Sequence, residues 1–317
     1  RGLGDVYKRQ VLGYTGKPDS YYNAIINWVK QRYDLVVAKE MINFVPGIVP
    51  GIGMAMNCFT QKGDKVMIQP PVYHPFAWVT TRNERTLVTN PLKWENGMYR
   101  MDLDTFREQI KGCKLFILCN PHNPGGVVWT EAELRAIADI CYDEKVLVFS
   151  DEIHADLTLP PHTHRPFATV SEKARMNSVT FMSPSKAFNM PGLSASHALI
   201  FNEDLRKRFR IYMDAGELDM GHVFAFLSVE AAYSHGTEWL DQCLAYIQGN
   251  IDFVDEFLKK HAPKIKAIRP EASYLVWLDC RELELSQKDL NEFFVDKAHL
   301  ALNDGEMFGK EGIGFMR

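Results

Sequence analysis

The chain has 317 residues and a formal net charge of −4, from 36 Lys and Arg against 40 Asp and Glu. Hydrophobic residues make up 46% and charged residues 24%, a balance typical of soluble globular proteins that excludes a disordered or collagen-like chain. No apolar run reaches the ~20 residues of a membrane span, and the mildly acidic charge gives no reason to expect nucleic acid or a membrane as partner.

The first ten residues differ in composition from the remainder of the chain. Residues 1–10 (RGLGDVYKRQ) are basic and lack apolar periodicity, so we expect a junction segment outside the fold. We expect residues 11–236 to form a large domain and residues 237–317 a smaller one that is truncated at GIGFMR.

Short apolar runs alternate with helical patterns in the larger part. Such runs are typical of strands buried on both faces, and they are 64–69 (DKVMIQ), 114–119 (KLFILC), 145–149 (KVLVF) and 178–182 (SVTFM). Between the second and third runs, Thr130 and Glu133 form a capping box that opens an amphipathic helix. This order predicts an α/β fold with a mostly parallel sheet flanked by helices.

The pattern changes after Gly236. A long helical stretch over 238–261 precedes a strand-like segment over 272–279 and a second helical stretch over 287–302. This predicts a smaller α+β unit at the C-terminal end of the chain.

The cysteines carry no sign of a disulfide framework. All six are scattered, without a CxxC pair, mostly in apolar surroundings: Cys58, Cys113, Cys119, Cys141, Cys243 and Cys280. We expect reduced thiols and a cytoplasmic protein. We expect no metal site either, because His162 and His164 have no carboxylate or Cys companion at ligand spacing and are predicted to be loop residues.

Polar and aromatic residues follow the four predicted strands. The segments after them are PPVYHPF, NPHNPGG, SDEIHADL and SPSKAFNMPGL. In an open parallel sheet, ligands bind outside the carboxyl ends of the strands. An aromatic ring, an amide, a carboxylate and an amine therefore meet at one edge, which suits a planar pyridine aldehyde cofactor.

In their order and separation, NPHNPGG, SDEIHADL and SPSKAF resemble the motifs of fold-type I pyridoxal-phosphate enzymes. Within that group the chain resembles the MalY/PatB-type cystathionine β-lyases, which are related to the class I/II aminotransferases. The resemblance implies the cofactor pyridoxal 5′-phosphate and a homodimer with shared active sites. It also implies carbon–sulfur β-lyase activity on cystathionine or another L-cysteine S-conjugate, giving a thiol, pyruvate and ammonia. An aminotransferase and a non-catalytic cofactor-binding regulatory protein are the alternatives.

The resemblance assigns five residues around the cofactor ring. Lys186 matches the lysine that bonds to the cofactor and moves protons at the substrate Cα, Asp151 the partner of the ring nitrogen, and Asn123 the donor to the phenolic oxygen. His154 matches a further contact of that oxygen, and Tyr73 the aromatic residue that stacks on the ring. Judged singly, each residue has a structural alternative. Lys186 could be a solvated surface lysine, Asp151 a helix cap and Asn123 a turn residue, while His154 could be a structural histidine and Tyr73 a core aromatic.

The phosphate group requires hydrogen-bond donors. PGIVPGIG predicts a turn that opens a helix, so the backbone N–H groups of Ile48 and Val49 would face a phosphate. Ser183 and Ser185 add hydroxyl donors, and Tyr14 matches a tyrosine that reaches the phosphate of the neighbouring subunit.

Two further positions bear on the reaction. Ser194 stands where aminotransferases commonly carry an arginine that pairs with the phosphate, which favours the lyase over the aminotransferase. Arg317 matches the arginine whose planar fork binds the substrate α-carboxylate, and a frayed terminal arginine is the alternative.

Overall fold

The computed structural model describes residues 14–317 and contains a seven-stranded central sheet. The order of its strands is β1-β9-β8-β7-β6-β2-β3. Their bounds are β1 Ile42–Val45, β2 Lys65–Ile68, β3 Thr86–Thr89, β6 Cys113–Cys119, β7 Leu147–Asp151, β8 Ser178–Met182 and β9 Ser196–Leu199. A separate hairpin pairs β4 (Lys93–Glu95) with β5 (Met98–Arg100).

The sheet is parallel except at one strand. β2, β3, β6, β7 and β8 pair in parallel, whereas β9 runs antiparallel to both of its neighbours, β8 and β1. The predicted fold class is therefore confirmed, and each of the four predicted strands is present within three residues of its expected limits. β1, β3 and β9 were not predicted.

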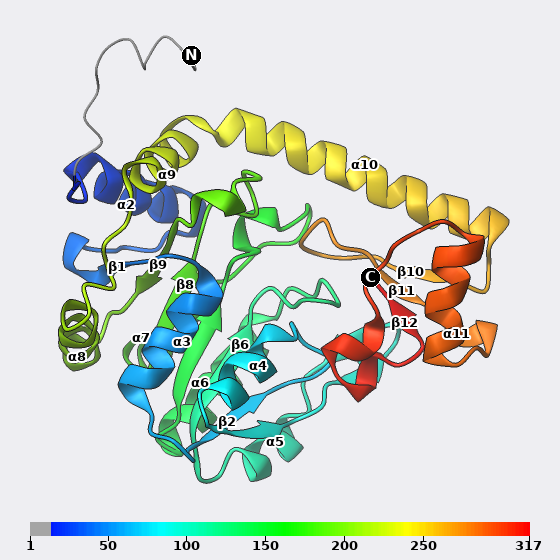
Figure 1. The fold of residues 1–317 in the computed structure, drawn as a ribbon, viewed down its shortest axis with the longest axis horizontal. Helices are drawn as coiled ribbons and strands as arrows, with labels where there is room; N and C mark the ends of the chain where they lie inside the picture. The colour runs from blue at the N-terminus through cyan, green and yellow to red at the C-terminus, as the bar shows by residue number, and fades with distance from the viewer. Residues whose placement is uncertain (1–13) are drawn as a thin grey trace.

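Helices cover both faces of this sheet (Figure 1). Their bounds are α2 Asp19–Tyr33, α3 Ile48–Phe59, α4 Pro75–Arg82, α5 Leu103–Gln109, α6 Glu131–Asp143, α7 Glu172–Met176, α8 Glu203–Asp214 and α9 Val223–His235. Helices α3, α4 and α8 share one hydrophobic cluster with the sheet, and α5, α6 and α7 share another. Successive strand residues such as Phe116 and Ile117 enter opposite clusters, as expected for strands buried on both faces. The capping box of Thr130 and Glu133 opens α6 as predicted.

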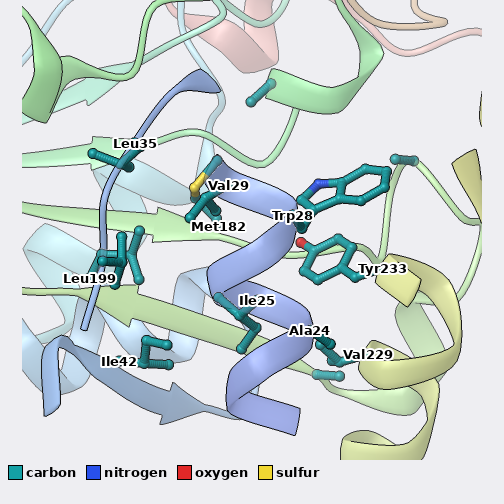
Figure 2. Close-up of a cluster of buried hydrophobic side chains, with 14 of the residues drawn as sticks. Ala24, Ile25, Trp28, Val29, Leu35, Ile42, Met182, Leu199, Val229 and Tyr233 are labelled. Carbon is teal, nitrogen blue, oxygen red and sulfur yellow. The ribbon is translucent and has the colours of Figure 1, made fainter. Parts of the chain in front are cut away.

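Helix α2 packs beside β1, β9 and α9 in a third cluster (Figure 2). Trp28 stacks on Tyr233 of α9, with ring centroids 4.8 Å apart, and Ile25 packs in the same cluster as Leu199 of β9. Burial of several large side chains makes this contact a main source of stability, at about 1.5–3 kcal/mol for each fully buried side chain. No helix among residues 14–317 is long and apolar enough to cross a membrane.

The C-terminal part begins with the longest helix, α10 (Thr237–His261), which runs along the molecule to the second sheet (Figure 1). That sheet is antiparallel and consists of β10 (Lys266–Ile268), β11 (Trp277–Asp279) and β12 (Phe315–Met316). Two predicted elements are shorter than expected: the strand over 272–279 is reduced to β11, and the helix over 287–302 to α11 (Gln287–Glu292) with a π-helical turn over 293–297. The domain boundary at residue 236 remains a prediction; α10 begins one residue after it.

Candidate active site

A cavity of about 400 Å³ lies at the sheet edge where the parallel strands end. Because β1 runs in the same direction as the parallel strands, residues 46–50 after it reach this edge. Because β9 runs the other way, the residues at its beginning, 194–196, reach the same edge. The direction of the strands thus places six chain segments around one cavity, whose size suits a small-molecule ligand.

Asp151 is the last residue of β7 and lines this cavity. Its carboxylate oxygen Oδ1 accepts a hydrogen bond of 3.1 Å from the backbone N–H of Ile153. Burial raises the pKa of Asp151 to about 7, and the neighbouring Glu152 adds to this rise, whereas Lys186 and the bond from Ile153 oppose it. A buried carboxyl group with one weak donor suits a positively charged N–H partner inside the cavity.

Lys186 lies in the turn that follows β8, half-buried, and lines the same cavity. Backbone hydrogen bonds fix this turn, from Phe188 N–H to Pro184 and from Met190 N–H to Ser185. The predicted neighbours of Lys186 differ in placement. Ser185 lines the cavity, whereas the Ser183 hydroxyl donates to the Ala195 carbonyl at 2.6 Å and supports the turn from behind.

Arg317 and Asn123 meet in the cavity although they are far apart in the chain. Arg317 Nη1 donates to Asn123 Oδ1 at 2.9 Å, and Nη2 donates to Asn303 Oδ1 at 2.7 Å. The guanidinium carbon lies 4.6 Å from the ring centroid of Phe308, and burial lowers the pKa of Arg317. Since its backbone N–H and C=O also pair with Asn303, Arg317 is not frayed. The bond to Arg317 occupies the amide oxygen of Asn123 and leaves its NH₂ group as the donor for a ligand.

His154, which lies three residues after Asp151, and Tyr73, which follows β2, also line the cavity. Burial, with Lys186 and Arg317 nearby, lowers the pKa of His154 to about 3, so its imidazole is neutral at physiological pH. Its Nδ1 atom is buried without a hydrogen-bond partner in the part of the chain that the structure describes. Tyr73 is half-buried, and burial followed by the Asp151 charge raises the pKa of its hydroxyl.

Helix α3 presents its N-terminus to the cavity. It begins at Ile48 after Gly47, which contributes no side-chain cap, and Val49 follows in the first turn. The first N–H groups of a helix have no acceptor within it, and the helix dipole makes this end positive, so the turn is suited to an anion. Ser194 lines the cavity as well.

Tyr14, like Ser183, is a predicted site residue outside the cavity lining. Its side chain is 97% exposed and does not line the cavity. Its proposed role at a neighbouring subunit therefore stays a prediction.

The cavity also contains residues that sequence reasoning missed. His74, Cys119, Ile153, Ser196 and Tyr274 all line it. Two of these residues lie close to predicted ones in the sequence, which could have identified them: His74 directly follows Tyr73, and Ile153 lies two positions after Asp151. No local signal marks Ser196 or Tyr274, because they arrive through the antiparallel β9 and through the segment before β11.

The donor set fits a planar pyridine aldehyde that carries a phosphate. The pKa of Asp151 is raised by burial, and the buried Nδ1 of His154 has no hydrogen-bond partner among residues 14–317, as expected for groups around a ring nitrogen and a phenolic oxygen. The N-terminus of α3 is suited to the phosphate, Lys186 supplies an amine and Tyr73 an aromatic face. An α/β fold with a lysine and a buried carboxyl group at the strand ends defines an enzyme of the pyridoxal-phosphate class.

Comparison with known proteins specifies the family. Residues 7–317 match the model of aminotransferase class I and II, and the chain belongs to that family. It is 39% identical over 309 residues to cystathionine beta-lyase PatB of Bacillus subtilis (strain 168), covering 97% of this chain and 80% of that relative. The resemblance to MalY/PatB-type cystathionine β-lyases is thereby confirmed.

Solved structures agree. A PLP-bound putative aminotransferase from Clostridium difficile 630 is similar with a TM-score of 0.96 and 39% identity, over 99% of this chain and 81% of that one. Cystalysin from Treponema denticola, which contains a pyridoxal 5′-phosphate cofactor, is similar with a TM-score of 0.95 and 35% identity, over 100% of this chain and 81% of that one.

Proposed function

We propose that the protein is a pyridoxal 5′-phosphate-dependent carbon–sulfur β-lyase that cleaves L-cystathionine or another L-cysteine S-conjugate. The observation that carries this proposal is the convergence of Lys186, Asp151, Asn123 and Arg317 on one cavity, in a chain similar to a cystathionine β-lyase. The serine at position 194, which lines the cavity where aminotransferases commonly carry an arginine, favours the lyase further.

The side chains divide the work between binding and proton transfer. Arg317 binds the substrate α-carboxylate through its planar fork, which is already oriented by Asn123 and Asn303. Asp151 holds a proton at the ring nitrogen, and the amine of Lys186 removes the proton from the substrate Cα. The N-terminus of α3 and Ser185 bind the phosphate, and Tyr73 packs against the ring face.

Pyridoxal phosphate, when bound, supplies an electron sink for the pair released at Cα. The Cβ–S bond then breaks, and the thiolate leaves with the bonding pair and takes up a proton. One water molecule supplies the keto oxygen of pyruvate, and the substrate nitrogen leaves as ammonia. The balanced reaction is L-cystathionine and water to L-homocysteine, pyruvate and ammonia.

The test measures pyruvate from L-cystathionine with added pyridoxal phosphate and no added keto acid. We expect pyruvate and a thiol in equal amounts from the wild type and at least a thousandfold less from Lys186→Ala, because Lys186 is the proposed base at Cα. Lys207→Ala, at an exposed position on α8, is the matched control and should retain activity. A bound-cofactor spectrum with no pyruvate would refute the lyase.

The two alternatives are distinguished in the same assay. An aminotransferase, the activity suggested by the name of the Clostridium difficile neighbour, would consume an added keto acid and release no thiol. A non-catalytic cofactor-binding protein would show the cofactor spectrum with no product from any amino acid.

The proposal includes a homodimer in which Tyr14 of one subunit reaches the phosphate site of the other. The fully exposed side chain of Tyr14 supports it. Mixing inactive Lys186→Ala with Tyr14→Ala should restore activity, because the hybrid dimer contains one intact site. Mixing Lys186→Ala with Asp151→Asn should not, because both residues belong to the same subunit's site. Equal behaviour of the two mixtures would contradict the shared site.

A cytoplasmic location completes the proposal. All six cysteines are free thiols, which supports a reducing compartment. Treatment of intact cells with a membrane-impermeant protease should leave the protein uncleaved if it is cytoplasmic.

A further inference from the structure

Behind Asp151 lies a second buried carboxylate, Glu152, which points away from the cavity. Asp151 lines the cavity and Glu152 does not, as expected for successive residues at a strand end, whose side chains alternate between faces. The Glu152 side chain is completely buried, and its Oε2 lies 2.8 Å from His164 Nε2. A buried carboxylate beside the proposed partner of the cofactor nitrogen requires an explanation.

Three donors satisfy this carboxylate. Glu152 Oε1 accepts hydrogen bonds of 2.8 Å from the Ser150 hydroxyl and from the backbone N–H of Phe167, and Oε2 accepts the third bond from His164. Three donors and no bonded acceptor describe an ionised carboxylate rather than a carboxylic acid. This donor set suits an ionised carboxylate at Glu152.

His164 contacts Glu152 through Nε2 alone. Its Nδ1 atom is buried and has no hydrogen-bond partner among residues 14–317, so a proton there would have no acceptor. A neutral imidazole with its proton on Nε2, donated to Glu152, satisfies the geometry. Within the same described residues, His164 is the one basic side chain within ion-pair distance of Glu152, so no Lys or Arg offsets an ionised carboxylate there.

The backbone of Glu152 ties this charge to the site. Its N–H donates to the Phe181 carbonyl at 2.9 Å, extending the pairing of β7 with β8, and its C=O accepts from Ala155 N–H at 3.0 Å. His154 lies within the turn that the bond from Ala155 N–H to the Glu152 carbonyl closes. Loosening the Glu152 side chain would therefore move both Asp151 and His154.

From this arrangement we propose that Glu152, held by His164, is a positioning residue that fixes Asp151 and His154 and whose buried charge keeps a proton on the pair formed by Asp151 and the cofactor nitrogen. The inference rests on the proposed cofactor. Glu152 touches neither the cavity nor the substrate and acts through Asp151.

The other groups around these two carboxylates are accounted for. Asp151 is faced by Lys186 after β8, Tyr73 after β2 and Cys119 at the end of β6, and Lys186 opposes retention of the proton. On the far side lies Asp156, which accepts hydrogen bonds from Trp28 and from Tyr33 of α2. Glu152 is the neighbour whose charge strengthens proton binding at Asp151.

The first test removes the charge and keeps the shape. In Glu152→Gln loaded with pyridoxal phosphate labelled with ¹⁵N in the ring, we expect the NMR midpoint for deprotonation of the ring nitrogen to fall by about one pH unit, the shift that one nearby buried charge produces. Glu271→Gln is the matched control, because Glu271 also accepts a backbone N–H, from Val128, and contacts neither Glu152 nor His164. A midpoint equal to that of the wild type would overturn the role of the charge.

The second test examines positioning and does not depend on folding of the first variant. His164→Phe keeps an aromatic ring beside Tyr33 and removes the donor to Glu152. We expect the Kd for pyridoxal phosphate, measured by fluorescence, to rise about tenfold, the loss typical of one charge-assisted hydrogen bond. Unchanged affinity in a folded variant would overturn the positioning role. Wild-type protein that binds no pyridoxal phosphate would instead overturn the proposed function, and this inference with it.

Discussion

Replacing Asp151 with Asn should change how the stability of the cofactor-free protein depends on pH. Burial raises the pKa of Asp151 from 3.8 to about 7 on folding. Because the folded-state pKa lies above the unfolded one, the folded state binds the proton more tightly. The Asp151 contribution is therefore fully favourable below about pH 4 and is lost as the pH rises through 7.

The size of this effect follows from linkage. Each unit of pKa difference corresponds to about 1.4 kcal/mol, and the part titrated between pH 5 and pH 7 amounts to about 2 kcal/mol. The free energy of unfolding of the wild type should fall by this amount relative to Asp151→Asn over that interval. The variant cannot ionise at residue 151, so the other groups cancel in the difference.

Urea unfolding of both cofactor-free proteins at pH 5, 6, 7 and 8 measures this difference. Asp279→Asn is the control: burial raises the pKa of Asp279, but the bonds and charge of Arg281 outweigh it and hold that pKa below its usual value of 3.8. Because Asp279 stays ionised from pH 5 to pH 8 in both states, the difference between Asp279→Asn and the wild type should not change over that interval. Parallel curves for the wild type and Asp151→Asn would refute the reasoning, since they would show that Asp151 ionises as easily in the folded protein as in the unfolded chain.

Three further predictions concern binding, backbone geometry and protonation. Arg317→Lys should raise KM for the amino-acid substrate at least tenfold with a smaller change in kcat, because an ammonium cannot form two parallel hydrogen bonds to a carboxylate; steady-state pyruvate assays measure this, and an unchanged KM would contradict the assignment. Gly126→Ala should lower the free energy of unfolding by roughly 2–4 kcal/mol in urea titrations, because φ is +67° and the new Cβ would lie 2.4 Å from Pro270 Cβ. The control Gly63→Ala, at φ +85° with open space around it, should lower it by only about 1 kcal/mol. His154→Gln should lower kcat by the same factor at every pH from 6 to 9, because the pKa of His154 is about 3 and its charge does not change there; a factor that varies with pH would contradict the neutral imidazole.

The four inner parallel strands, β2, β6, β7 and β8, were predictable because they are buried on both faces, whereas the parallel edge strand β3, whose residues are exposed or half-buried, was not. Continuous apolar runs such as 114–119 and 178–182 identify themselves in the sequence, and the motif residues follow them directly. The strands β1 (INFV) and β9 (SHAL) are four residues long and contain the polar residues Asn43 and His197, which obscure the pattern. The pairing of β9 with β8, the pairing of β1 with β9 and the burial of both strands are tertiary effects, and they make these segments strands.

The candidate site shows the same division between local and long-range information. Asp151 and Lys186 were placed from their position after a strand. The hydrogen bond of Arg317 to Asn123, the diversion of the Ser183 hydroxyl to Ala195, and the partnership of His164 with Glu152 all join segments that meet only after folding. His164 is a loop residue, as predicted, but it is buried and has a carboxylate partner that sequence spacing did not reveal.

The hydrogen bonds from Arg317 to Asn123 and Asn303 have a thermodynamic consequence for substrate binding. A mobile arginine side chain loses rotational entropy when it binds a ligand, which costs about 0.5–1.5 kcal/mol. Here the two amide oxygens and the Phe308 ring restrict the guanidinium before any ligand arrives, so this loss is incurred during folding. The guanidinium is thus already ordered when the carboxylate binds, so binding loses less side-chain entropy and the affinity for the amino acid is higher than with a free arginine.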